Sequence, residues 1–163
     1  MDHISYTWYE SPVGPLLLAG SHAALRYVSF SAGKHAVAIE PRWTENRNMF
    51  REAIRQLSEY FAGERKTFTL ELGPPGTEFQ RSVWTELRKI PYGETISYKQ
   101  LAERIRKPKA VRAVGAANGA NPIPIIIPCH RVIGHDGGLT GFGGGLPLKK
   151  RLLELESRQV ALL

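Results

Sequence analysis

Cys129, the only cysteine of the chain, and the adjacent His130 form the pair with the clearest capacity for chemistry. A lone cysteine cannot form an internal disulfide or a thiolate metal cluster, so it serves either packing or reactivity. A free thiol titrates at about 8.5 and needs a base or a positive environment to be a nucleophile at neutral pH. His130 is the candidate base. Because neighbours on an extended segment point to opposite sides, their contact would need a turn or a bridging water.

Glu156 is the candidate third member of this group. Four positions near the C-terminus are spaced i, i+3, i+4 and i+7: Lys149, Leu152, Leu153 and Glu156. A helix therefore places Glu156 on the face of two leucines, where a carboxylate is unfavourable unless it is paired. We predict that it orients His130 and stabilises the imidazolium. The alternatives are an outward-turned Glu156 or pairing with Lys149 or Arg131. Glu154 lies off this face and should be a solvated charge.

The N-terminal third is expected to supply strands and one helix. Alternating or short apolar runs predict strands at Ile4, Tyr6 and Trp8, which share one face, at 16–19, at 25–30, and at Phe68, Leu70 and Leu72. Apolar residues within 49–61 recur at helical spacing, and Gly63 is the expected C-terminal stop.

A stiff breaker, Gly73-Pro74-Pro75-Gly76, follows these elements. The charge character also changes there, so we predict a linker at 73–76 between an N-terminal sheet-and-helix domain (1–72) and a C-terminal domain (77–163). The expected fold class is α/β (α+β), with a mainly helical C-terminal domain that contains a helix-turn-helix, winged-helix-like element.

Capping signals place the helices of the C-terminal domain. Thr77 with Gln80, and Ser97 with Gln100, have the spacing of capping boxes and predict two helix starts. Pro108 is expected in the first turn of a third helix that continues through 110–117. Pro147 should open the last helix.

Two further segments connect the helices. The proline-rich stretch 121–124 predicts an extended, rigid path to Cys129. Asp136-Gly137-Gly138 predicts a turn, and the glycine-rich stretch 141–145 predicts a loop of low steric bulk.

The net charge of +7 is unevenly distributed. Residues 1–76 carry eight basic and eight acidic side chains, whereas residues 77–163 carry fourteen and seven. A basic bias confined to one domain favours a polyanionic partner over a merely solvated face. The stretch 99–112 holds six basic residues and one acidic residue, which is typical of a phosphate-contacting element. The small residues beside Arg112 permit either close approach to such a partner or tight internal packing.

Several motifs follow in order along residues 77–157: Ile96-Ser97-Tyr98 with Leu101-Ala102, Lys109 to Gly115 around Arg112, Asn121-Pro122, Pro128-Cys129-His130-Arg131-Val132, and Leu152 to Glu156. Together they closely resemble the O6-alkylguanine-DNA alkyltransferases. The resemblance implies direct-reversal repair, in which O6-alkylguanine, and also O4-alkylthymine, is flipped out of duplex DNA and gives its alkyl group irreversibly to Cys129. Such a suicide methyltransferase reacts once per molecule.

The resemblance also implies roles for individual residues. Cys129 would accept the alkyl group, activated through a water by His130 with Glu156 behind it, while Asn121 would brace the turn before the cysteine. Tyr98 would donate a proton to O6, with Lys149 as a contributor. Arg112 would replace the flipped nucleotide in the stack, from a helix in the minor groove. The further DNA contacts would be Tyr98, Ala110, Ala113, Ala117 and Arg131, and the substrate pocket would include Pro124, Val132, Phe142 and Gly143.

Gly143 departs from family members that carry serine there, so this loop would contact the base through its backbone alone. Some members bind zinc through cysteines and histidines of the N-terminal domain, but His3 and His22 alone do not make such a site. We therefore expect no metal and no cofactor. Alkyltransferase-like proteins, which bind lesions without repair, replace the acceptor cysteine, so Cys129 argues against that alternative.

The rival functions are a non-catalytic DNA-lesion binder and a thiol hydrolase or redox protein for small molecules. No charged leader opens the chain, and no apolar stretch approaches the roughly 18 residues of a membrane span. The expected protein is a monomer in the cytoplasm, or wherever DNA is accessible, with double-stranded DNA as partner, no membrane association and no obligate protein partner.

Overall fold

The computed structural model describes residues 3–31, 36–140, 142 and 144–161 of the chain. The N-terminal elements are β1 (Ser5–Ser11), β2 (Gly14–Gly20), β3 (Leu25–Phe30), β4 (Thr44–Glu45), the 3₁₀ helix η1 (Arg47–Phe50) and α1 (Arg51–Phe61). The C-terminal elements are α2 (Glu78–Leu87), β5 (Ile96–Ser97), α3 (Tyr98–Arg104), α4 (Val111–Gly119), the 3₁₀ helix η2 (Cys129–Arg131), β6 (Val132–Ile133) and α5 (Leu146–Ala161). This is the mixed α/β class that the sequence predicts.

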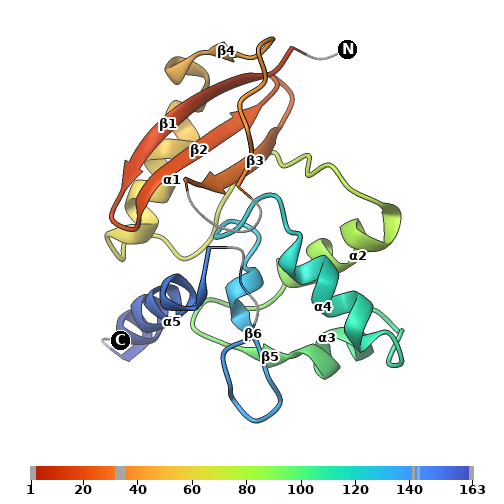
Figure 1. Ribbon diagram of the computed structural model, residues 1–163. Coiled ribbons are helices and arrows are strands. Elements are labelled where there is room, and N and C mark those ends of the chain that lie inside the picture. The colour runs from red at the N-terminus through yellow and green to blue at the C-terminus, as the bar shows by residue number, and fades with distance from the viewer. Residues whose placement is uncertain (1–2, 32–35, 141, 143, 162–163) are drawn as a thin grey trace.

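The N-terminal sheet has the strand order β3-β2-β1-β4. β1 and β3 pair antiparallel with β2, and β4 pairs parallel with β1. Helix α1 lies behind the sheet (Figure 1). In β1 the buried residues are Ser5, Thr7 and Tyr9. The face shared by Tyr6 and Trp8 is therefore the more exposed one.

The strand expected at 68–72 does not form. Leu72 makes only an isolated bridge to Leu25, supported by hydrogen bonds from Leu25 N to Glu71 O at 2.9 Å and from Gly73 N to Leu25 O at 2.8 Å. The next residues, Pro74 and Pro75, have no N–H to continue a ladder. The helix stop at Gly63 is confirmed, because this residue has φ +79° and its N–H bonds to Tyr60 O.

Both capping boxes are present, with Thr77 and Gln80 opening α2 and Ser97 and Gln100 opening α3. The predicted start of the third helix is wrong. α4 begins at Val111, and Pro108 lies in a separate turn closed by a hydrogen bond from Ala110 N to Lys107 O. The reason is a left-handed Arg106 (φ +63°) just before this turn, a conformation that a non-glycine sequence does not signal.

The path to Cys129 is turned rather than extended. Ile127 N donates to Ile123 O at 2.9 Å, and Ile125 has φ +74°. Asn121 supports the turn, since its amide donates to Ile127 O at 2.8 Å and its oxygen accepts from Ile123 N at 3.0 Å. This compact bend allows η2 to begin at Cys129 directly below the N-terminal sheet.

One apolar core joins the two parts of the chain. Its fully buried members include Leu16 and Leu57 from the first part and Trp84, Leu101 and Leu152 from the second. Val28 N of β3 donates to Pro122 O at 2.9 Å, so the edge of the sheet is tied to the turn before the cysteine. Pro147 lies in the first turn of α5, as predicted. Among the described helices, none has the length and apolarity to cross a membrane.

Candidate active site

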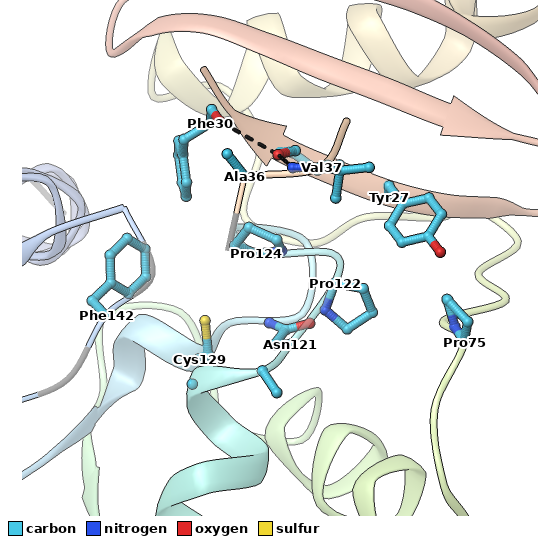
Figure 2. Close-up of a pocket in the computed structure, with 14 residues that line it drawn as sticks. Tyr27, Phe30, Ala36, Val37, Pro75, Asn121, Pro122, Pro124, Cys129 and Phe142 are labelled. Atoms are coloured by element: carbon cyan, nitrogen blue, oxygen red, sulfur yellow. Dashed lines mark hydrogen bonds between the residues drawn. The ribbon is translucent and has the colours of Figure 1, made fainter. Parts of the chain in front are cut away.

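Cys129 lies at the first position of η2, beneath a cavity between the two parts of the chain. The residue is 5% exposed, and its N–H donates to Ile127 O at 2.7 Å. Asn118 of α4 donates a longer hydrogen bond, 3.3 Å, to the Cys129 carbonyl. Figure 2 shows the sulfur pointing into the space between Phe142 and Pro124. The fold therefore buries the thiol while keeping one side of it open to an apolar chamber.

Glu156 turns inward from α5 and meets His130. Its Oε2 lies 2.7 Å from His130 Nε2, and the two side chains are 1% and 0% exposed. Leu152 on the same face is also buried, whereas Glu154 is exposed with only a distant ion pair to Lys150. The helical spacing thus predicted both the inward carboxylate and the solvated one.

Glu156 has more partners than the sequence indicated. Arg131 binds it twice, with Nε to Oε1 at 2.8 Å and Nη2 to Oε2 at 3.1 Å. The Gly93 N–H donates to Oε1 at 3.3 Å, and the Tyr60 hydroxyl donates to Oε2 at 2.6 Å. Pairing with Arg131, one of the alternatives, therefore occurs together with pairing to His130.

These contacts determine the charge of each group. Burial raises the pKa of Glu156, but the hydrogen bonds and charges of His130 and Arg131 outweigh it and hold this pKa well below its usual range. Burial lowers the pKa of His130, against the opposing pull of Glu156. Burial likewise raises the pKa of Cys129 to about 11, although Asn121 and Lys149 oppose that change. At neutral pH the site holds a thiol, a neutral imidazole and a carboxylate.

The imidazole can link this group to the thiol. With Nε2 engaged by Glu156, its other nitrogen, Nδ1, is buried and has no hydrogen-bond partner among the described residues. Buried polar atoms are normally satisfied, so this nitrogen is a suitable acceptor for a water-carried proton. Nδ1 is therefore the nitrogen that a water bridging from Cys129 would contact.

Lys149 and Tyr98 meet at one carbonyl. Lys149 Nζ donates to Thr140 O at 2.7 Å and to Val132 O at 2.6 Å, and burial lowers the pKa of Lys149 to about 8. The half-buried Tyr98 hydroxyl donates to the same Thr140 O at 2.9 Å. The two side chains are also close to each other, since Nζ lies 5.9 Å from the centre of the Tyr98 ring.

The cavity above Cys129 has a volume of about 310 Å³. Its walls come from β3 and the segment after it, Pro75, the end of α4, the bend that leads to Cys129, and the loop before α5: Tyr27, Val28, Ser29, Phe30, Ala36, Val37, Pro75, Gly119, Ala120, Asn121, Pro122, Pro124, Cys129 and Phe142. Pro124 and Phe142 are thus placed as expected. Val132 is fully buried and does not line the cavity, because it faces the core beside β5. Gly143 lies outside the described residues.

Some of the residues that the sequence predicts to contact DNA lie on the surface, and others are buried. Arg112 and Ala113 are exposed on α4, and Ala110 is half-buried. Ala117 lies on the inner face and is 4% exposed, so its side chain does not reach the surface. Arg131 is 6% exposed and is not available to DNA, because its guanidinium binds Glu156 and the carbonyl of Ile90. Small residues on α4 therefore serve internal packing as well as the exposed face.

Comparison with known proteins identifies the family. Residues 78–158 match the 6-O-methylguanine DNA methyltransferase, DNA binding domain, and residues 4–74 match the ribonuclease-like domain of the same family. The chain belongs to the 6-O-methylguanine DNA methyltransferase family. In the part of the chain that the structure describes, no group of three or more His, Cys, Asp or Glu residues is placed to hold a metal ion.

Relatives within this methyltransferase family cover almost the whole chain. A methylated-DNA--protein-cysteine methyltransferase of Methanosarcina acetivorans is 56% identical over 151 residues, which are 93% of this chain and 97% of the relative. The crystal structure of Mycobacterium tuberculosis OGT in complex with DNA superposes with a TM-score of 0.88 at 48% identity, covering 96% of this chain and 94% of the other. An O6-methylguanine-DNA methyltransferase from Pyrococcus kodakaraensis has a TM-score of 0.67 at 25% identity.

Sequence reasoning missed the N-terminal contributions to this methyltransferase site. Tyr60 reads as a core residue of an amphipathic helix, and nothing near it in sequence signals a partner on α5. The cavity walls Phe30 and Val37 come from a strand end and a loop. Asn118 was also missed, although a polar residue on the inner face of a small-residue helix was an available signal.

Proposed function

We propose that Cys129 is the alkyl acceptor of a direct-reversal repair protein for O6-alkylguanine, and also O4-alkylthymine, in duplex DNA. The observation that carries this proposal is the buried Cys129 at a largely apolar cavity, next to His130, whose Nε2 lies 2.7 Å from Glu156. The family match and the cysteine methyltransferase relatives support the same reaction. Each molecule would react once, because the alkyl group ends on Cys129 as a thioether, which is stable in water.

The proposed reaction begins with proton transfer from the thiol through a water to His130 Nδ1. The thiolate attacks the alkyl carbon on O6, the S–C bond forms, and the C–O6 bond breaks with its electron pair on oxygen. The Tyr98 hydroxyl, which donates a hydrogen bond to the Thr140 carbonyl in the free protein, would donate to O6 instead and give its proton to the leaving base. The proton on His130 then passes to solvent, and Tyr98 is reprotonated from solvent. The net change replaces the hydrogen of Cys129 with the alkyl group.

DNA would approach the exposed face of α4. Arg112 and Ala113 lie there, and the half-buried Ala110 precedes the helix. A helix with such small side chains fits the minor groove, and the single long cation can occupy the space of an extruded nucleotide. The Mycobacterium tuberculosis relative, whose crystal structure is in complex with DNA, supports DNA as the partner.

We further infer that the chain divides at 73–76 into domains 1–72 and 77–163. The proline-rich sequence there, and the two family matches that end at 74 and begin at 78, support this division. The chain would act as a monomer, without an obligate protein partner, in the cytoplasm or wherever DNA is accessible.

The test is stoichiometric alkylation of Cys129. The purified chain is incubated with duplex oligonucleotide containing O6-methylguanine, and the peptide that holds Cys129 is analysed by mass spectrometry. We expect one methyl group per chain and restored guanine. Cys129→Ala should bind the oligonucleotide with the same affinity and transfer nothing.

Two outcomes would overturn the proposal. Folded, DNA-bound protein without an adduct would indicate the non-catalytic lesion binder. Repeated turnover on a small substrate, with no response to DNA, would indicate a thiol hydrolase.

A further inference from the structure

The N-terminal helix α1 contributes one hydroxyl group to the buried pair of His130 and Glu156. Tyr60 is fully buried, and its hydroxyl donates to Glu156 Oε2 at 2.6 Å. The same oxygen lies 2.7 Å from His130 Nε2. Among the described residues of the first part of the chain, no other side chain has a hydrogen bond to Glu156. Tyr60 and His130 therefore share one carboxylate oxygen.

The surrounding rings hold this hydroxyl in place. Phe61 and Phe68 lie 5.3 and 5.6 Å from the Tyr60 ring, and Tyr92 packs edge-on at 6.1 Å. Burial, followed by the charge of Glu156 and the hydrogen bond to it, raises the pKa of Tyr60 far above its ordinary value. The group is consequently a permanent donor, and its hydrogen bond to a carboxylate is of the strong, charge-assisted type.

A donor at this position changes what the carboxylate does for the imidazole. Glu156 Oε2 attracts the proton on Nε2 and stabilises the cation that forms when His130 accepts the thiol proton. Every additional donor to Oε2 withdraws negative charge from it and weakens that attraction. The hydroxyl thus fixes the position of the oxygen and restrains its basicity, so that His130 remains neutral and able to accept a proton at rest.

We propose that Tyr60 is a positioning residue for alkyl transfer, through which the N-terminal domain holds Glu156 for His130. This assignment rests on the proposed role of Cys129 and gives the N-terminal domain a part in the reaction beyond packing.

The groups that face His130 and Glu156 come from four segments. They are Tyr60 on α1, Tyr92 in the connection from α2 to β5, Arg131 on η2, and Lys149 on α5. Arg131 and Lys149 carry positive charge at neutral pH and oppose protonation of His130. Because these groups remain when the Tyr60 hydroxyl is removed, a shift in the pH dependence reports on that hydroxyl.

The experiment compares Tyr60→Phe with Tyr92→Phe in single-turnover methyl transfer from duplex O6-methylguanine DNA between pH 5 and 8.5. Tyr92 is a matched control, because its hydroxyl is also buried beside Glu156 but has no hydrogen-bond partner among the described residues. We expect the Tyr60→Phe protein to transfer the methyl group about 10-fold more slowly at pH 7.5, because Glu156 Oε2 loses the hydrogen bond that fixes its position beside His130. The acid limb of its rate profile should move to higher pH, because an unrestrained Oε2 makes His130 easier to protonate. Tyr92→Phe should leave the limb unchanged.

A second substitution should shift the acid limb in the opposite direction while keeping both the ring and its hydroxyl. 3-Fluorotyrosine at position 60 is a stronger donor, so the acid limb should move to lower pH. An unchanged limb in both variants would overturn the proposal and leave Tyr60 a packing residue, as would an equal shift in Tyr92→Phe. Loss of transfer in the unsubstituted protein itself, with DNA binding intact, would instead count against the proposed role of Cys129.

Discussion

The two sides of Cys129 are built in opposite ways. On one side, both oxygens of Glu156 are hydrogen-bonded, and the partners come from η2, α1 and the segment after α2. On the other side, the thiol faces an open cavity with largely apolar walls, supplied among others by β3, Pro75 and the loop before α5 (Figure 2). The groups that would transfer the proton thus lie apart from the cavity that would hold the alkyl group. Each side includes residues of the N-terminal part, Tyr60 on the first and Phe30 and Val37 on the second.

The difference predicts unequal tolerance to substitution. A buried charge network is costly to disturb, because a lost partner leaves another polar group unsatisfied. A substitution in the open apolar wall of the cavity changes only the contact area with the substrate and the shape of the cavity. Changes on the Glu156 side should therefore affect all substrates, while changes in the cavity should discriminate between alkyl groups.

The largest effect is expected from Glu156→Gln. The amide keeps the size of the side chain but removes the charge that pairs with His130 and Arg131, both of which are buried. Methyl transfer should fall by about 100-fold, within the range for loss of general acid–base support. The free energy of unfolding should fall by about 3 kcal/mol, because Arg131 is left as an uncompensated buried cation. Single-turnover kinetics and denaturant unfolding measure the two effects.

Glu154→Gln is the matched control on the same helix. That side chain is 62% exposed and lies 3.9 Å from Lys150, so both measurements should stay at the unsubstituted values. A Glu156→Gln protein that transfers within twofold of the original would contradict the division between the two sides.

A second effect, on stability, follows from the pH dependence of the same network. His130 and Glu156 both have a lower pKa in the folded protein than the ordinary values of 6.5 and 4.5. The unfolded chain therefore binds more protons, and stability that is complete above pH 6.5 is lost as pH falls, first through His130 and then through Glu156. The melting temperature measured by circular dichroism should decrease as pH falls below 6.5.

Glu156→Gln again provides the comparison, since its further decrease below pH 4.5 should be smaller than that of the unsubstituted protein. An unsubstituted protein whose melting temperature is the same at pH 7 and pH 5 would show that the burial of His130 has no energetic consequence.

The same contrast explains which features could be predicted from the sequence. His130, Glu156 and the helix starts at Thr77 and Ser97 depend on local spacing, and local spacing is visible in one sequence. The partnership of Tyr60 with Glu156 depends on how α1 packs against α5, which no local pattern encodes. Tyrosine at an inner helical position is a normal core residue.

The errors have a related cause. Arg106 and Ile125 adopt positive φ without being glycine, and each redirects a segment that was expected to be helical or extended. Hydrogen bonds that span each residue hold these conformations, as when Lys107 N donates to Ala102 O across Arg106. The Asn121 side chain, for example, holds the bend around Ile125 by bonding on both sides of it.

The smallest effect is expected in the cavity. Val37 lines it from the N-terminal part, and its N–H donates to Ser29 Oγ at 2.8 Å, a backbone contact that a larger side chain leaves intact. Val37→Trp should narrow the space above Cys129, so transfer of a benzyl group should slow by about 10-fold while methyl transfer changes by less than about twofold. The measurement is the ratio of the single-turnover rates for O6-benzylguanine and O6-methylguanine DNA.

Ile39→Trp is the control for this substitution, because Ile39 is 38% exposed and does not line the cavity. The ratio of benzyl to methyl transfer should be unchanged in that variant. If Val37→Trp slowed benzyl and methyl transfer equally, the substitution would act on the thiol rather than on the fit of the alkyl group. That result would contradict the proposed division of roles between the two sides of Cys129. A selective loss of benzyl transfer would instead show that the N-terminal part limits substrate size through one wall of the cavity.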